Sequence, residues 1–255
     1  MENPILDFKG SKQTLLTGPS AATLVIVLLL MNLLTACGQS GSAPSGSSTP
    51  GNYTTSFPLT ENPISEQGEW INGGTVGLDW TNVQTTPGLA FGTESGSVNY
   101  DDATAVLTGA WASDQTAQAT VYTVNQNSNI FEEVELRLRT TITAGSIAGY
   151  EFNFRCTADA SQYVQIVRWD GPLGSFTLLD STAGPGLHNG DVVKATAVGS
   201  TLTTYINGTA IFSVTDSTYT GGSPGIGFYN QNGTVSNDGD YGFTNFTASD
   251  GTTTN

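Results

Sequence analysis

Charged and polar side chains occupy every second position along two neighbouring stretches of the sequence. They are Glu133, Glu135, Arg137 and Arg139 in the first stretch, then Glu151, Asn153 and Arg155 in the second. Side chains two residues apart on a β-strand point to the same face. Two carboxyl groups placed in this way can lie about 5–7 Å apart, which is within the range for acid and nucleophile in glycoside hydrolysis.

Glu133 and Glu135 are therefore the candidate catalytic residues, but a salt-bridged strand surface is the competing interpretation. A general acid needs a raised pKa, and we expect Arg155 to face Glu135 and to lower it. We accordingly predict no catalytic group.

The remaining polar groups could recognise a sugar. Sugar recognition needs planar hydrogen-bonding groups for the hydroxyls and an aromatic ring for the apolar face of the sugar ring. The predicted ligand-binding residues are Arg137, Arg139, Glu151, Asn153, Arg155 and Trp169. An ordinary solvated sheet surface would explain the same pattern.

A β-hairpin must position these residues. Apolar side chains fill the alternate positions of Phe131–Ile142 and Gly149–Cys156, so we predict two strands joined by a turn near Gly145. Residues whose numbers sum to about 290 should then face one another. This register pairs Leu138 with Phe152, Leu136 with Phe154, Val134 with Cys156, Arg139 with Glu151 and Glu135 with Arg155. Hydrophobic and charge pairings agree in this register.

The clearest strand signal lies in residues 190–228, where Asn207-Gly208 separates two alternating runs. This dipeptide favours a two-residue type I′ turn, because both central positions need a positive φ. Further strands are predicted at Tyr53–Leu59, Gly77–Val83, Leu89–Gly92, Ser97–Tyr100, Ala105–Ala112, Ala119–Val124, Gln162–Trp169, Ser175–Leu179 and Tyr241–Ala248. No stretch has a helical period, so the sequence predicts β-structure throughout.

The N-terminal residues have the layout of an export signal. Lys9 and Lys12 precede an apolar run over residues 21–34, and Leu34-Thr35-Ala36-Cys37 resembles a bacterial lipobox with lipid on Cys37. A plain signal peptide or an uncleaved anchor are the alternatives. We predict a signal peptide over 1–36, a lipidated Cys37 and flexible Gly/Ser/Pro linker over 37–52, a β-domain over 53–250 and a tail over 251–255.

The chain carries 7 Lys and Arg residues against 22 Asp and Glu residues, and its net charge is −15. Such a surface repels phosphate backbones and anionic lipid, which argues against nucleic acid as a partner. Contact with a membrane is therefore expected through a lipid anchor only. Asp238 and Asp240 offer carboxylates of the kind that calcium prefers, although acidic turns are common without a metal. We expect no cofactor, with a structural calcium ion as the alternative.

Several glycine-rich turns and strands resemble the concanavalin A-like lectin/glucanase (laminin-G-like) jelly roll. The resemblance covers roughly residues 57–250, and the residues that carry it are Gly190-Asp191, Tyr205-Ile206-Asn207-Gly208, Gly225-Ile226-Gly227 and Gly242-Phe243-Thr244-Asn245-Phe246. It implies a two-sheet antiparallel jelly-roll sandwich whose members bind or cleave glycans, usually on the concave face of the larger sheet.

Two departures from the family pattern bear on function. The glucanase branch has two Glu flanking an Asp on one strand, whereas this chain has Glu132-Glu133-Val134-Glu135. Thr244 stands where many relatives have an Asp that helps to hold calcium.

The sequence thus predicts a bacterial cell-envelope lipoprotein that binds glycan or polysaccharide. A glycoside hydrolase or polysaccharide lyase, and a structural or adhesive protein with a protein partner, are the alternatives.

Overall fold

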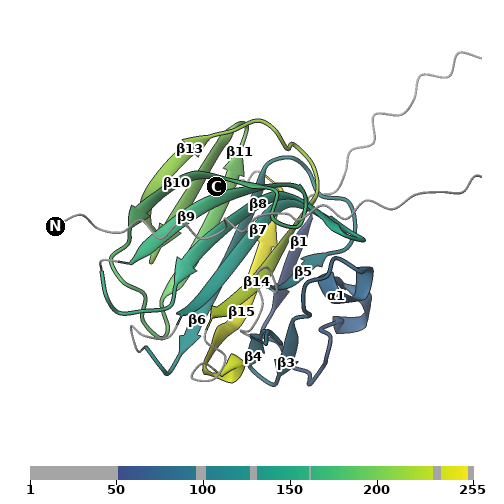
Figure 1. Ribbon diagram of the computed structural model, residues 1–255, viewed down its shortest axis with the longest axis vertical. Coiled ribbons are helices and arrows are strands. Elements are labelled where there is room, and N and C mark those ends of the chain that lie inside the picture. Colours follow the sequence, from purple (N-terminus) through teal and green to yellow (C-terminus); the bar gives the residue numbers. More distant parts are fainter. Residues whose placement is uncertain (1–50, 96–101, 127–130, 161, 232–236, 252–255) are drawn as a thin grey trace, which may run out of the picture. The chain divides into compact units, whose positions relative to one another are not determined.

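The computed structural model describes residues 51–95, 102–126, 131–160, 162–231 and 237–251. Over these residues the chain forms two antiparallel sheets, one of seven and one of eight strands, packed face to face (Figure 1). The predicted two-sheet antiparallel sandwich is confirmed. Within the described ranges, no helix is both long and apolar enough to cross a membrane.

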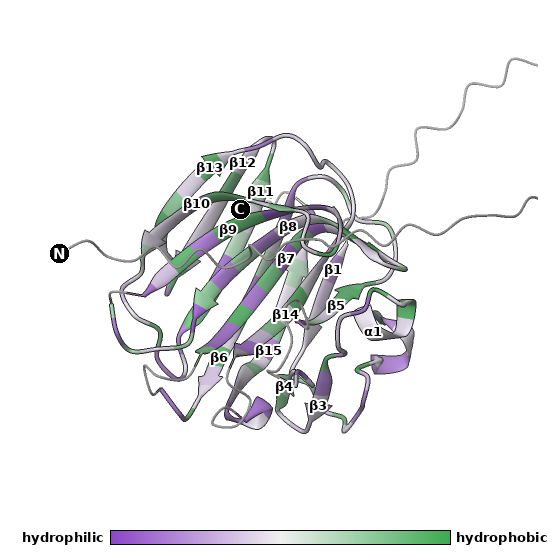
Figure 2. Ribbon diagram, in the orientation of Figure 1, coloured by the Kyte–Doolittle hydropathy of each residue, from purple (hydrophilic) through white to green (hydrophobic). Residues whose placement is uncertain are grey.

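The seven-stranded sheet contains the predicted hairpin at its centre. Its order is β10 (Phe176–Ala183), β9 (Tyr163–Pro172), β8 (Ser146–Arg155), β7 (Phe131–Thr143), β14 (Ser223–Gln231), β5 (Ala103–Leu107) and β2 (Trp70–Asn72). Figure 2 shows hydrophilic and hydrophobic segments alternating along β7, β8 and β9. β7 and β8 therefore present an apolar face to the core and a polar face away from it.

The eight-stranded sheet is built around the last strand. Its order is β13 (Thr209–Thr215), β12 (Thr201–Ile206), β11 (Val192–Val198), β6 (Gln115–Thr123), β15 (Tyr241–Ser249), β4 (Leu89–Phe91) and β3 (Gln84–Thr86), and β1 (Asn52–Thr55) also pairs with β15. Asn207 and Gly208 join β12 to β13 with φ angles of 50° and 77°, as the predicted type I′ turn requires.

The main core lies between the two sheets. From the seven-stranded sheet it takes the inward residues of the hairpin, including Leu136, Phe152 and Phe154, and from the other sheet residues such as Phe243 and Phe246. All five are completely buried. The apolar alternation seen in the sequence therefore identified the core face correctly.

The predicted register of the hairpin is wrong by two residues. Leu136 faces Phe152, Arg137 faces Glu151 and Glu133 faces Arg155, so paired numbers sum to 288. The two strands are joined by a turn between Thr143 and Ser146. A bulge in β7, between Leu138 and Thr141, changes the sum of the paired residue numbers by one. Because the shift is even up to Leu138, the side chains of β7 before the bulge still lie on the predicted face.

Glycine makes this bulge possible. Arg139 has a φ of 51°, and Gly149 stands opposite it with a φ of 142°. A Cβ atom at Gly149 would lie 2.6 Å from the carbonyl oxygen of Arg139. The two backbones can approach so closely only because residue 149 has no side chain.

Other boundaries differ from expectation mainly near the N-terminus. The predicted strand Gly77–Val83 is wrong, because α1 (Gly73–Val76) is followed by a segment in which Asp79 has a φ of 67°. Two 3₁₀-helices, η1 (Glu66–Gly68) and η2 (Asp238–Asp240), also interrupt the β-structure. The strand predicted at Ala105–Ala112 ends at Leu107, and Ser97–Tyr100 lies outside the described residues.

Candidate functional site

The hairpin carries its charges on the side of the seven-stranded sheet that faces away from the core. We call this surface the polar face; it comprises Glu133, Glu135 and Arg137 of β7, Glu151, Asn153 and Arg155 of β8, and the side chains of neighbouring strands in the same rows. Five of the six predicted ligand-binding residues lie on it. All five are buried, with Arg137 0 % and Trp169 1 % exposed.

Three charged groups form the centre of the polar face. Arg137 donates from Nη1 to Glu151 at 2.7 Å and from Nη2 to Glu135. Glu151 also accepts a hydrogen bond from Nε1 of Trp169. We refer to Glu135, Arg137 and Glu151 as the charged centre.

Burial dominates the electrostatics of the charged centre. Desolvation, followed by repulsion from Glu151, holds the pKa of Glu135 well above its usual range although Arg137 opposes the shift. Desolvation disfavours the charged guanidinium, but Glu135 and Glu151 outweigh it and raise the pKa of Arg137. One carboxyl with a raised pKa therefore lies next to a second carboxyl and a permanent cation.

Asp102 brings a third carboxylate to the charged centre. Oxygen atoms of Asp102, Glu135 and Glu151 lie within 4.8 Å of one another, a spacing that could hold a metal ion. Arg137 already bonds two of these carboxylates. Its guanidinium supplies the positive charge that a metal would otherwise provide.

The charged centre fits against β14 because the residue at that point of the strand is a glycine. Gly227 of β14 is the register partner of Glu135, and a Cβ atom there would lie 2.2 Å from Oε2 of Glu135 and 2.7 Å from Nη2 of Arg137. The Glu135–Arg137 pair therefore lies across the backbone of β14. Any larger residue at 227 would displace it.

An apolar cover closes one end of the polar face. Leu78 and Trp80, from the segment after α1, pack against Val106, Val167 and Trp169 of the sheet. Trp80 meets Trp169 edge to face at 4.8 Å between ring centroids, and its ring lies 5.0 Å from Cζ of Arg137. Trp169, predicted as an aromatic plate for a sugar, therefore lies in a second small core.

The opposite end of the polar face carries half-buried aromatic rings. Phe131 lies 6.1 Å from Tyr163 and 5.8 Å from Tyr229 between ring centroids. Cζ of Arg155 stands 3.6 Å from the centroid of Phe131, and the hydroxyl of Tyr163 donates to Glu133 at 2.5 Å. We call these five residues the aromatic end.

The sequence indicated only part of the aromatic end. Glu133 and Arg155 were singled out, whereas Phe131, Tyr163 and Tyr229 were not. Tyr163 belongs to β9 and Tyr229 to β14, and the place of β14 beside β7 follows from the sheet order. A small hollow beside this end is lined in part by Arg155, Tyr163 and Gly186.

The expected pairing of one catalytic candidate is wrong. Glu135 faces Asn153 rather than Arg155, and Glu133 faces Arg155. Arg137, two residues further along β7, forms an ion pair with Glu135. The expected pKa-lowering cation is therefore present next to Glu135, but it is Arg137.

Arg139 leaves the polar face because of the bulge. The expected contact with Glu151 is wrong, since Arg137 holds that position. The guanidinium of Arg139 instead donates to the carbonyl oxygens of Ser113, Tyr219 and Gly199, and it is buried. Its bonds join three loops.

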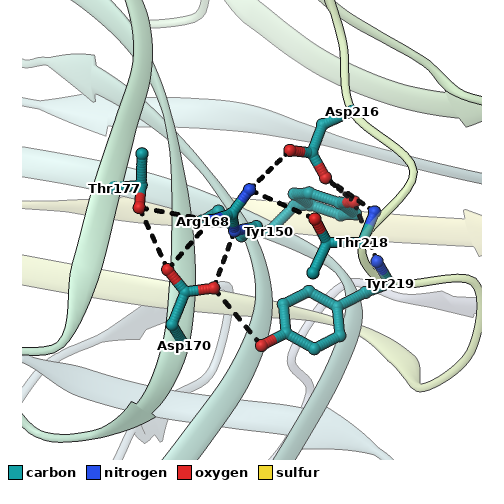
Figure 3. A network of polar contacts seen from close by, with 7 residues as sticks. All are labelled: Tyr150, Arg168, Asp170, Thr177, Asp216, Thr218 and Tyr219. Carbon is teal, nitrogen blue, oxygen red and sulfur yellow. Dashed lines mark hydrogen bonds and ion pairs between the residues drawn. The ribbon is translucent and has the colours of Figure 1, made fainter.

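A separate polar network lies where β9 and β10 meet the segment after β13 (Figure 3). All five N–H groups of Arg168 have acceptors: Nε bonds Asp170, Nη1 bonds Asp216 and Thr218, and Nη2 bonds Asp170 and Thr177. Although burial opposes it, hydrogen bonds from Tyr150 and Thr218 lower the pKa of Asp216 to about 2. Because no donor of Arg168 remains for a ligand, we interpret this network as structural.

The remaining predicted sites are placed as follows. Asp238 accepts a hydrogen bond from Nδ2 of Asn230 at 2.7 Å, whereas Asp240 lies at the end of η2 and is half-buried. Cys37, the predicted lipidation site, lies outside the described residues.

No protein-family model matches the sequence, and no curated protein matches it. Solved structures do match. β-Agarase A in complex with oligoagarose superposes with a TM-score of 0.51 at 11% identity, over 82% of this chain and 95% of that one. The metal-free carbohydrate recognition domain of Emp46p gives 0.50 at 11% identity, over 78% and 96%. The fold of this chain is therefore the concanavalin A-like jelly roll of lectins and glucanases.

Proposed function

We propose that the chain binds carbohydrate and that the aromatic end of the polar face is the contact surface. The observation that carries the proposal is the set of three half-buried rings, Phe131, Tyr163 and Tyr229, on the polar face of a concanavalin A-like sandwich. Aromatic rings offer the apolar surface that a sugar ring stacks on. Support also comes from the similar structures, which include a carbohydrate recognition domain and an agarase with bound oligoagarose.

The buried charges next to these rings fit a positioning role. Glu133 accepts a hydrogen bond from the Tyr163 hydroxyl, and Arg155 stacks on Phe131, so two of the three rings are held by a group that is itself more than nine-tenths buried. A surface that is ordered before binding loses less conformational entropy when the ligand arrives. This differs from the expectation from the sequence, in which Arg137, Glu151 and Trp169 touched the sugar directly.

Glycan-array binding of the full chain, with neutral and acidic glycans, tests the proposal. We expect Phe131→Ala and Tyr229→Ala each to weaken binding about 3- to 10-fold, because an aromatic contact contributes about 0.5–1.5 kcal/mol. Tyr122→Ala is the matched control, since Tyr122 is a half-buried tyrosine of β6 in the other sheet. Absence of binding to every glycan, or equal losses in Tyr122→Ala, would refute the proposal.

Glycoside hydrolysis is the second candidate function. It is favoured by the raised pKa of Glu135 beside Glu151, since a protonated and an ionised carboxyl in one site are the usual acid and nucleophile. Product analysis after incubation with each bound glycan decides between the two. Turnover that disappears in both Glu135→Gln and Glu151→Gln would establish an enzyme, and binding without cleavage would leave a lectin-like module.

We also propose that Cys37 carries a lipid that anchors the chain to a bacterial cell envelope. The proposal rests on the apolar run followed by Leu34-Thr35-Ala36-Cys37 and on the Gly/Ser/Pro stretch after it. Metabolic labelling with a radioactive fatty acid should mark the wild type and not Cys37→Ser. Equal labelling of both would reject the anchor.

A further inference from the structure

The ring of Trp80 covers a part of the polar face that has the groups for holding a sugar. It meets the ring of Trp169 edge to face, at 4.8 Å between centroids, and lies 5.0 Å from Cζ of Arg137. Trp169 is an aromatic plate held in place by its bond to Glu151, and Arg137 is a planar hydrogen-bonding group. Sugar recognition needs one group of each kind. Trp80 therefore occupies the place where a sugar ring would meet both.

Two N–H groups at this contact are buried and have no hydrogen-bond partner. One is Nε1 of Trp80, and the other is Nε of Arg137, whose Nη1 and Nη2 bond Glu151 and Glu135. Trp80 is 3 % exposed, and Arg137 is completely buried. A buried donor without an acceptor costs free energy, because it has lost its bonds to water and has gained none in return. Burial of the Trp80 ring stabilises the closed contact, and the two unused donors oppose it.

The backbone is fixed on both sides of Trp80. The amide of Gly145 donates to the carbonyl oxygen of Gly77 at 2.7 Å, and the amide of Thr81 donates to that of Asp102 at 3.2 Å. Between these bonds, Asp79 is exposed and has a φ of 67°, a left-handed conformation that is uncommon outside glycine. The apolar cluster that holds Trp80 is separate from the main core. The side chain of Trp80 can therefore leave its place without disturbing the sandwich.

We propose that Trp80 blocks an inner sugar subsite and that an oligosaccharide displaces its side chain. The proposal rests on the proposed carbohydrate binding and extends it from the aromatic end along the same face. In the displaced state a sugar ring packs on Trp169, a sugar hydroxyl accepts the hydrogen bond from Nε of Arg137, and Nε1 of Trp80 bonds water. Four residues of β7, about 13 Å, separate Glu133 at the aromatic end from Arg137. A ligand that reaches both places is an oligosaccharide.

Tryptophan fluorescence of the full chain tests the displacement. The probe is the oligosaccharide that the wild type binds most tightly on the glycan array. Saturation with it should shift the emission of the wild type to longer wavelength and increase quenching by acrylamide, because Trp80 enters water. Trp80→Phe should lose both changes. Trp70→Phe is the matched control and should keep them, since Trp70 is also buried but lies in the main core.

Affinity separates the inner subsite from the aromatic end. Trp80→Ala removes the blocking ring and should bind the oligosaccharide at least about 3-fold more tightly, because the ligand no longer has to displace a side chain. If Trp80→Ala does not fold, the emission of the wild type decides alone.

Two results would overturn the inner subsite and leave the aromatic end in place. One is binding by the wild type without a change in emission, and the other is unchanged or weaker binding by a folded Trp80→Ala. Absence of binding by the wild type would instead refute the proposed carbohydrate binding and the inner subsite with it.

Discussion

Glu133 and Glu135 lie two residues apart on the same face of β7, yet their surroundings are opposite in kind. Glu135 bonds Arg137 beneath the cover formed by Leu78 and Trp80. Glu133 bonds the half-buried Tyr163 at the aromatic end. The alternation of a strand decides which side chains share a face, but the segments that pack on that face decide whether a buried side chain lies beneath an apolar cover or beside half-buried rings.

The largest loss of stability is expected when the cation is removed from the charged centre. Arg137→Leu leaves Glu135 and Glu151 buried without their partner, and we expect a loss of about 3–5 kcal/mol in the free energy of unfolding. Urea unfolding measures it. Lys194→Leu is the control, because Lys194 is partly exposed and stacks on Tyr205, and it should change stability by less than about 0.5 kcal/mol. Similar values for both variants would contradict the buried arrangement.

A smaller loss in the free energy of unfolding is expected when a methyl group is added at Gly227, next to the charged centre. Gly227→Ala places a Cβ atom 2.2 Å from Oε2 of Glu135, so the ion pair must shift, at a cost of about 1–3 kcal/mol. Gly221→Ala is the matched control, since no heavy atom lies within 4 Å of its Cβ position. Chemical unfolding of both variants should show a loss for Gly227→Ala alone.

The raised pKa of Glu135 predicts a pH dependence. The folded protein keeps this proton to a higher pH than the unfolded chain, in which Glu titrates near about 4.3. The stability contributed by the protonated carboxyl is present below the unfolded pKa and is lost as the pH rises through the folded pKa. Relative to Glu135→Gln, the wild type should therefore lose stability as the pH rises from about 4.3.

Urea unfolding at several pH values checks this dependence. The difference in free energy of unfolding between Glu135→Gln and the wild type should grow in favour of the variant with rising pH. Glu69→Gln, a change at an exposed position, is the matched control. A difference that stays constant, or that grows in favour of the wild type, would show that Glu135 is ionised throughout.

The smallest effect is expected at the aromatic end. Tyr163→Phe removes one hydrogen bond to Glu133, and we expect a loss of about 1 kcal/mol. Tyr205→Phe, in the other sheet, is the control. A loss at Tyr163 as large as that of Arg137→Leu would mean that the two regions do not differ in burial as described.

Much of the fold could be predicted because β-structure has a period of two. Alternation along residues 131–142 and 149–156 identified the faces of β7 and β8, and Asn207-Gly208 identified a turn. The register could not be predicted in the same way. A bulge changes the pairing but leaves no mark on the alternation, so Arg139 was assigned to the wrong contact.

The sequence also did not indicate which segments pack on the polar face. Residues 77–83 alternate like a strand, yet Leu78 and Trp80 point at the polar face, and Trp169 is buried beneath them. The alternation placed the charged residues of the hairpin on one face, apart from Arg139, but it did not indicate that they are buried. Solvation depends on what lies above a strand, and local alternation carries no information about it.

The sequence by itself determined that the domain is built of β-strands, which faces of β7 and β8 are polar, and that Glu133, Glu135, Arg137, Glu151 and Arg155 share one surface. Those properties follow from side-chain alternation, which is local. Only the tertiary structure decided that Arg137 and Trp169 are buried and that Phe131, Tyr163 and Tyr229 meet at one end. These depend on strand order, a bulge and loop packing, which bring together residues far apart in the chain.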